Sequence, residues 1–204
     1  VEVNKYPLKQ IEDLARGNRK IGLGIMGFAD VLFRLEVAYD SPEAERFAAE
    51  LMSFMQKEAM EASIALGQQR EPFPNFPESI YDKPGHPPVR NAARTTIAPT
   101  GTIGLIAGCS SGIEPQFALA YVRRAFEGDQ LRVVDPFFRE VGEREGWYSE
   151  ELADKVTEAG SCQHAEEVPA KWRCIFVTAH DIAPEWHVRI QAAFQRATDN
   201  AVSK

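Results

Sequence analysis

The sequence has 204 residues, of which 44% are apolar, 10% aromatic and 26% charged. This composition is typical of a globular protein and excludes disordered, collagen-like and mucin-like chains. A chain of this length can bury about 70% of its unfolded surface, so its core needs no disulfide bonds. The three cysteines are widely spaced and form no C-x-x-C pair, which indicates a reducing compartment, and we expect the cytoplasm.

The charge argues against nucleic-acid and membrane partners. The 23 basic and 30 acidic residues give a net charge of −7, whereas a nucleic-acid binder is usually basic. No window approaches the roughly 18 consecutive apolar residues of a membrane span. The first ten residues lack the pattern of a signal peptide, and the chain does not begin with Met, so we expect a processed protein or a fragment. Residues 83–124 nevertheless carry five basic residues and one acidic residue, which fits either a local anion site or a solvated face.

The first half of the chain is predicted to be mainly helical. Apolar spacing predicts a short helix over residues 8–15 that Gly17 ends, a buried strand or extended entry over 20–25, and a second helix from Phe28 to Leu35. Ser41 and Pro42 are a typical helix start, and a long helix should run from there to about residue 69. Residues 72–88 contain six of the thirteen prolines, which predicts an extended connection.

The second half alternates short strands with helices. Arg94–Ala98 (RTTIA) is β-branched and predicts a strand that enters a tight turn. The other expected elements are strands at residues 117–122 and 175–178 (IFVT) and helices that start near Asp135, Ser149 and Pro184. This alternation favours an α/β fold with a mostly parallel sheet.

Three motifs suggest chemistry but have better structural explanations. Gly22, Gly24 and Gly27 fit the G-x-G-x-x-G string of dinucleotide sites, yet a polar run precedes them and no acidic strand end follows, so close packing is favoured. His180 and His187, with Cys174 and Asp181, lack the paired spacing of a metal site. Cys109 lies in a small-residue turn without an assignable base, which favours a packing role over a nucleophile.

The segment Ala98–Gly104 (APTGTIG) is a stronger candidate. A strand end supplies rigidity, the glycines permit close backbone approach, and two threonine hydroxyls with successive amides offer donors to a tetrahedral anion. An ordinary strand-to-helix turn explains the same residues. The residues alone leave both interpretations open.

Longer strings identify a family. The sequence closely resembles the catalytic chain of ribonucleotide reductases, specifically the adenosylcobalamin-dependent class, along its whole length and in order. The strings that carry the resemblance are Asn18–Asp30 (NRKIGLGIMGFAD), Arg94–Pro115 (RTTIAPTGTIGLIAGCSSGIEP), Phe117–Arg124 (FALAYVRR), Val177–Gln195 (VTAHDIAPEWHVRIQAAFQ) and Thr198–Lys204 (TDNAVSK).

The resemblance implies a fold, an activity and a substrate-binding loop. It implies part of the ten-stranded α/β barrel that reduces the 2′-hydroxyl of a ribonucleotide by radical chemistry, with residues 1–204 as a single segment incomplete at both ends. In the family, the stretch that matches Pro99, Thr100, Gly101, Thr102 and Ile103 holds the substrate phosphates through backbone amides and hydroxyls. For the full enzyme the resemblance implies adenosylcobalamin as cofactor, a ribonucleotide substrate, a dithiol reductant such as thioredoxin, and a homodimer.

The family's catalytic loop, an Asn-Pro-Cys-Gly-Glu string, does not occur in the sequence. Cys109, Cys162 and Cys174 match none of the catalytic cysteines, so we assign no catalytic residue and no metal ligand to this chain. Two alternatives stay open: a catalytic-chain fragment of the metal-radical class, which shares the barrel, and a non-catalytic nucleotide-binding or assembly module.

Overall fold

The computed structural model describes residues 1–124 and 130–203, so Lys204, which closes the TDNAVSK string, lies outside it. The chain divides into two compact units. We call Val1–Gly24, Ala49–Ala98 and Phe194–Ser203 unit 1, and Ile25–Ala48 with Pro99–Ala193 unit 2. No helix in the described ranges is both long and apolar enough to cross a bilayer.

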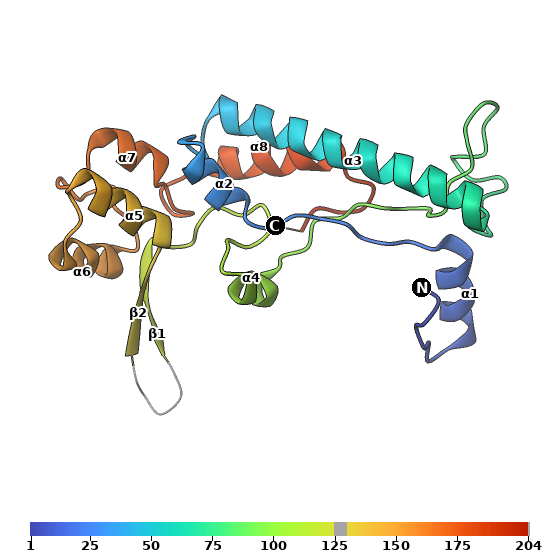
Figure 1. The fold of residues 1–204 in the computed structure, drawn as a ribbon, viewed down its shortest axis with the longest axis horizontal. Coiled ribbons are helices and arrows are strands. Elements are labelled where there is room, and N and C mark those ends of the chain that lie inside the picture. Colours follow the sequence, from blue (N-terminus) through green and yellow to red (C-terminus); the bar gives the residue numbers. More distant parts are fainter. Residues whose placement is uncertain (125–129, 204) are drawn as a thin grey trace. The chain divides into compact units, whose positions relative to one another are not determined.

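Unit 1 is built from helices and extended segments (Figure 1). Helix α1 (Lys9–Asn18) confirms the short first helix, but Gly17 lies inside it, and Arg19 takes the left-handed conformation that ends it (φ 50°). The segment after α1 is extended, as expected, and pairs in parallel with the predicted strand at 94–98 through a bridge between Leu23 and Thr95. Of the two alternatives, the extended entry is the one observed and the buried strand is not, because Ile21 and Leu23 are about half exposed.

Helix α3 (Pro42–Arg70) is the long helix expected from its start signal. The Ser41 hydroxyl accepts the Ala44 N–H at 3.1 Å, so the predicted cap is confirmed. The proline-rich stretch after it has neither helix nor strand. Residues 94–98 are extended but form only isolated bridges, the second of which joins Ile97 to Val202 in parallel.

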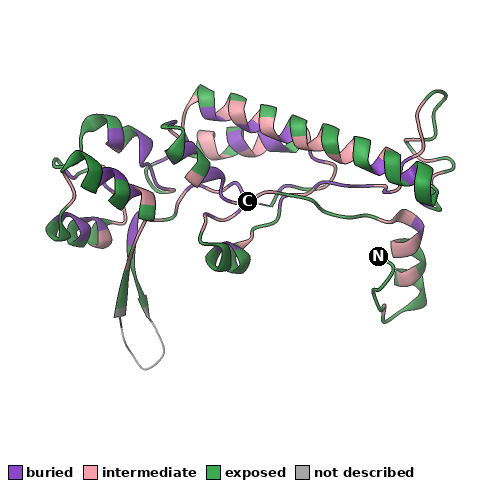
Figure 2. Cartoon of the chain, viewed as in Figure 1, coloured by how far each residue is buried: buried purple, intermediate pink, exposed green. Residues whose placement is uncertain are grey.

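Unit 2 contains several helices and a two-stranded hairpin that projects from them (Figure 1). Besides the start of α3 (residues 42–48), its helices are α2 (Phe28–Arg34), α4 (Gly101–Ala107), α5 (Pro136–Glu145), α6 (Glu150–Ala159), α7 (Ala170–Ile175) and most of α8 (Pro184–Gln195). Strands β1 (Ala120–Arg124) and β2 (Gln130–Val134) pair antiparallel, with Ala120 opposite Val134. The core gathers Phe33, Phe138, Trp172 and Phe176, and Figure 2 shows the buried faces of α5–α7 turned toward it.

Local start signals in this unit are confirmed. The Asp135 carboxylate caps α5 by accepting the N–H groups of Phe137 and Phe138, and the Ser149 hydroxyl caps α6 by accepting the N–H of Leu152. Helix α8 begins at Pro184 as expected. Each of these signals acts over three residues, so tertiary context hardly alters it.

The strand predictions were less successful. The strand expected over 117–122 begins only at Ala120. The expected strand at 175–178 was wrong, because Ile175 ends α7 and the Phe176 N–H bonds to the Trp172 carbonyl. A short apolar run buries equally well in a helix turn, so periodicity could not decide between them. In the described ranges the antiparallel hairpin is the only sheet of paired strands. Of the expected parallel sheet, only the two isolated parallel bridges of unit 1 are seen.

Candidate substrate-binding loop

The predicted loop Pro99–Ile103 enters helix α4 through a strained residue. Thr100 is the residue before the helix and takes the left-handed conformation, with φ 55° and ψ 24°. A β-branched residue is rarely found there because its side chain crowds the backbone. Such strain persists where surrounding contacts enforce it and is concentrated at functional sites.

The first turn of α4 has no side-chain cap. The Thr100 side chain makes no capping hydrogen bond to the helix, and the first N–H to bond back along the chain is that of Gly104, to the Thr100 carbonyl at 2.7 Å. The preceding amides, of Gly101, Thr102 and Ile103, have no carbonyl to reach within the helix. These three residues are exposed. The turn therefore presents three N–H groups and the Thr102 hydroxyl to solvent, which is the donor set that a phosphate accepts.

The Thr100 hydroxyl is committed elsewhere. Its oxygen accepts the Gly112 N–H at 2.7 Å. The Thr102 hydroxyl has no partner among the described residues and lies on an exposed residue. The two threonines predicted to act alike thus differ: Thr102 faces outward, while Thr100 is tied to the return segment, which we define as residues 108–116.

The glycines of the loop also differ in role. A Cβ on Gly104 would lie 3.1 Å from the Cys109 carbonyl oxygen, so a side chain there would crowd the return segment. A Cβ on Gly101 would meet nothing within 4 Å, and Gly101 is not among the residues with positive φ. Gly101 therefore needs no special dihedral angles, because Thr100 takes the left-handed position. Close approach of a ligand at Gly101 stays a prediction.

Two of the three cysteines, Cys109 and Cys162, lie in surroundings that disfavour the thiolate. Burial, together with the nearby Asp30 carboxylate, raises the pKa of Cys109, and burial raises the pKa of Cys162 to about 12. Cys174 is exposed. Activation requires a lowered pKa, so the packing role expected for Cys109 is the better interpretation.

The glycine triplet serves close packing. In unit 1, a Cβ on Gly24 would lie 2.2 Å from the Thr96 carbonyl oxygen, and one on Gly22 would lie 2.4 Å from the Thr96 methyl carbon. Gly27, in unit 2, has φ 82° and precedes α2. The first two glycines let two extended segments touch, and the third makes a helix start.

The side chains considered as metal ligands make ordinary contacts within the protein. The Asp181 carboxylate accepts hydrogen bonds from the Thr178 N–H and hydroxyl and from the Ser161 hydroxyl. His180 packs edge-on against Phe117, and His187 Nε2 lies 3.2 Å from the Ala179 carbonyl oxygen. Within residues 1–124 and 130–203, no three His, Cys, Asp or Glu side chains gather as metal ligands would.

A buried ionic network anchors the extended segment 94–98, which leads to the loop. Asp199 accepts the Arg94 Nη2–H at 2.7 Å, the Arg94 backbone N–H at 2.7 Å and the Gln56 amide at 2.5 Å. The Thr95 hydroxyl donates to the Gln56 side-chain oxygen and accepts the Asp199 N–H. Arg94 is fully buried, and its Nε and Nη1 have no partner in the described part of the chain. Sequence reasoning missed this network, since Arg94 and Asp199 are 105 residues apart.

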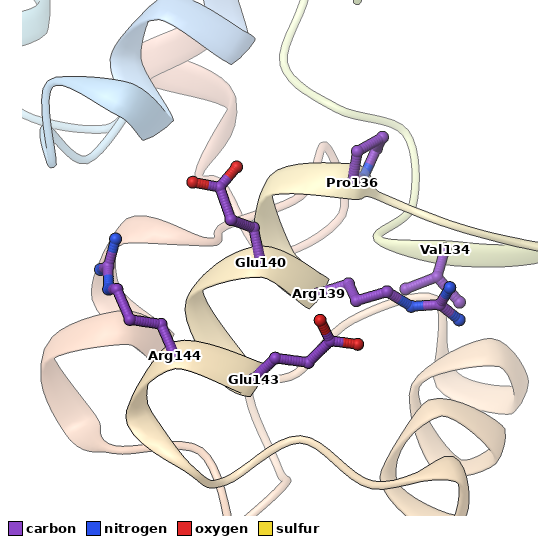
Figure 3. A pocket seen from close by; sticks show the side chains of 6 residues that line it. All are labelled: Val134, Pro136, Arg139, Glu140, Glu143 and Arg144. Carbon is purple, nitrogen blue, oxygen red and sulfur yellow. The ribbon is translucent and has the colours of Figure 1, made fainter.

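A shallow hollow on α5 lies apart from this chemistry. It has a volume of about 580 Å³ and is lined by Val134, Pro136, Arg139, Glu140, Glu143 and Arg144. Figure 3 shows charged side chains of both signs spread along the helix rather than converging on one point. It has none of the convergent donors that the loop provides.

Comparisons with known proteins decide the family. The family described as "Ribonucleotide reductase, barrel domain" matches residues 1–204. The chain belongs to this family. A vitamin B12-dependent ribonucleoside-diphosphate reductase of Thermoplasma acidophilum is 48% identical over all 204 residues, and one of Mycobacterium tuberculosis is 45% identical. The resemblance seen in the sequence is therefore confirmed.

The fold agrees with this family. The class Id ribonucleotide reductase alpha subunit of Actinobacillus ureae superposes with a TM-score of 0.81 over 97% of the chain, at 21% sequence identity, and the chain covers 35% of that subunit. The chain spans 26% of the Thermoplasma reductase and 29% of the Mycobacterium one. The described residues therefore show part of this fold and not a full ten-stranded barrel.

Proposed function

We propose that this chain is a segment of the catalytic barrel of an adenosylcobalamin-dependent ribonucleotide reductase, which reduces ribonucleoside diphosphates to deoxyribonucleotides. The relatives named as vitamin B12-dependent are 45–48% identical. Relatives named as subunit alpha of ribonucleoside-diphosphate reductases reach 27–28%. This difference in identity favours the cobalamin-dependent class over the metal-radical class.

We assign to the loop Pro99–Ile103 the task of holding the substrate phosphates. The single observation that carries this assignment is the uncapped first turn of α4, whose N-cap residue accepts a hydrogen bond from Gly112 instead of capping the helix. Three amides and the Thr102 hydroxyl can then bond phosphate oxygens directly. The chemistry at the 2′-carbon would occur elsewhere in the pocket, so the loop fixes position rather than reacting.

The wider assignments concern the full catalytic chain. Residues 1–204 would form one segment of a ten-stranded α/β barrel, in which neighbouring strands cover the exposed Ile21 and Leu23. The hollow on α5, of about 580 Å³, contains no residue of the loop. A second hollow, of about 430 Å³ and lined by residues of α1 and the segments beside it, contains none either. Neither hollow by itself forms a corrin site. In the full chain the cofactor would supply the radical, and the residues of this segment would bind and orient the substrate. A dithiol reductant such as thioredoxin and a homodimeric, cytoplasmic enzyme complete the proposal.

The test is turnover by the full catalytic chain, purified without any other protein. With adenosylcobalamin and a dithiol we expect deoxyribonucleotide formation, and without the cofactor we expect none. Turnover that ignores adenosylcobalamin and requires a second, radical-generating subunit would assign the chain to the metal-radical class instead. No turnover under either condition, with nucleotide binding intact, would favour a binding module.

A further inference from the structure

The return segment is held by the first turn of helix α2. The Gly27 N–H donates to the Ser110 carbonyl at 2.8 Å, and the Phe28 N–H donates to the Gly112 carbonyl at 3.3 Å. In the opposite direction, the Ser110 N–H donates to Oδ2 of Asp30 at 2.7 Å. Three hydrogen bonds therefore fix the backbone of residues 110–112 on one helix end.

The same backbone supports the loop. The Gly112 N–H bonds to the Thr100 hydroxyl oxygen, and the Cys109 N–H bonds to the Gly104 carbonyl at 3.0 Å. A β-branched residue keeps a left-handed conformation only if its surroundings enforce it. Among the described residues, this contact is the hydrogen bond that engages the Thr100 side chain. The position of Gly112 therefore decides whether the first turn of α4 stays uncapped.

Both oxygens of the Asp30 carboxylate are used. Oδ1 accepts the Gln116 side-chain amide at 2.7 Å, while Oδ2 accepts the Ser110 N–H. The Gln116 amide nitrogen also lies 3.3 Å from Asp135, the residue that caps α5. An asparagine at position 30 would remove the negative charge, so the Ser110 N–H would bond to a neutral acceptor, and the Gln116 side chain would have to turn its oxygen toward the asparagine amide.

We propose that Asp30 is a positioning residue for the phosphate loop. It acts from α2 through Ser110 and Gly112 on Thr100, and it touches neither the substrate nor the reacting atoms. This role rests on the proposed function of the loop. Its consequence is that a change at Asp30 weakens the binding of phosphates while leaving contacts to the base and the sugar intact.

The experiment compares variants of the full catalytic chain. Dissociation constants are measured for a ribonucleoside diphosphate and for the matching nucleoside with parent, Asp30→Asn, Thr100→Val and the double variant. We expect Asp30→Asn to weaken diphosphate binding about tenfold, the size of one lost hydrogen bond to a charged group, and to leave nucleoside binding unchanged. The double variant should lose no more than the weaker-binding single variant, because both changes break one chain of contacts.

Asp181→Asn is the matched control. Its carboxylate also holds a loop of unit 2 by accepting a backbone N–H and a hydroxyl, at Thr178, and among the described residues this loop meets the return segment only at its far end, where the Ala179 N–H donates to the Gln116 carbonyl. We expect this variant to keep the parent's affinity for both ligands. An equal loss for diphosphate in Asp30→Asn and Asp181→Asn would reduce Asp30 to a general structural role and overturn the proposal.

Two further outcomes distinguish a failure of the role proposed for Asp30 from a failure of the loop assignment on which it rests. Loss of diphosphate affinity in Thr100→Val but not in Asp30→Asn would overturn the role of Asp30 and leave the loop assignment standing. No loss in either variant would overturn both. If Asp30→Asn does not fold, hydrogen exchange of the parent decides: added diphosphate should slow exchange at residues 108–113 as well as 100–104, and protection confined to 100–104 would contradict the proposal.

Discussion

Thr100 shows how one residue can open a helix end. Threonine before a helix usually caps it by accepting an N–H of the first turn. Here the hydroxyl accepts the Gly112 N–H, and the residue adopts φ 55°. The amides that a cap would use are left for a ligand. Threonine is common at this position, so it is the left-handed conformation of Thr100, rather than its residue type, that points to a binding site.

Asp135 is a second residue whose setting determines its chemistry. Burial raises the pKa of its carboxyl above the ordinary 3.8, and the nearby Asp30 carboxylate raises it further, while the N–H groups of Phe138 and Phe137 and the charge of Arg34 lower it. Above pH 3.8 the folded protein therefore retains a proton that the unfolded chain has released. The contribution of this group to the free energy of unfolding falls as the pH rises through that window.

Asp135→Asn should remove this pH dependence while keeping an oxygen to cap α5. We expect the free energy of unfolding of the variant, relative to the parent, to improve as the pH rises from about 4 and then to level off. Urea unfolding at a series of pH values measures this difference. A difference that is constant with pH, or that worsens as the pH rises, would contradict the raised pKa.

At the scale of elements, unit 1 depends on one carboxylate. Asp199 joins the segment 94–97 to helix α3 through Gln56 and to the last extended residues of the chain. The side chains of Arg94 and Asp199 are 2% and 10% exposed. A buried pair of this kind contributes little more than a good apolar contact would, but breaking it leaves a charge without a partner.

Asp199→Ala should therefore lower the free energy of unfolding by about 3–5 kcal/mol, because Arg94 would remain buried and unpaired. Replacing both residues, as in Arg94→Met with Asp199→Leu, should recover much of that loss. Glu150→Ala is the surface comparison. It breaks an ion pair between the exposed residues Arg132 and Glu150 and should change the free energy by no more than about 1 kcal/mol. Equal effects of Asp199→Ala and Glu150→Ala on denaturant unfolding would contradict this account.

At the scale of the whole molecule, local signals were readable and distant pairings were not. The caps at Ser41, Asp135 and Ser149 were predicted because a cap acts on amides two or three residues away. The strand expected at 175–178 was wrong because a run of three apolar residues fits a helix end equally well. The pairing of Ile97 with Val202 and the bond from Gly112 to Thr100 join residues whose proximity no local pattern encodes.

The candidate site was predictable as a segment but not in its details. The glycines and threonines of Pro99–Ile103 indicated an anion site, and the family resemblance pointed to the same residues. The division of labour between Thr100 and Thr102 could not be read from the sequence, because both are threonines next to glycine. The difference follows from the position of the return segment. Helix α2, which lies about 80 residues earlier in the chain, holds that segment through Asp30 and Ser110, and Gly112 then bonds to Thr100.

The most direct test of the central claim, that Pro99–Ile103 holds substrate phosphates, is nucleotide binding by a Thr102→Val variant of the full catalytic chain. Valine has nearly the volume of threonine but lacks the hydroxyl, so only the hydrogen bond is removed. We expect ribonucleoside diphosphate to bind about ten- to a hundredfold more weakly and the nucleoside to bind as before, since a hydrogen bond to a charged oxygen contributes about 1.5–3 kcal/mol. Equal losses for both ligands, or no loss for the diphosphate, would show that this threonine does not hold a phosphate.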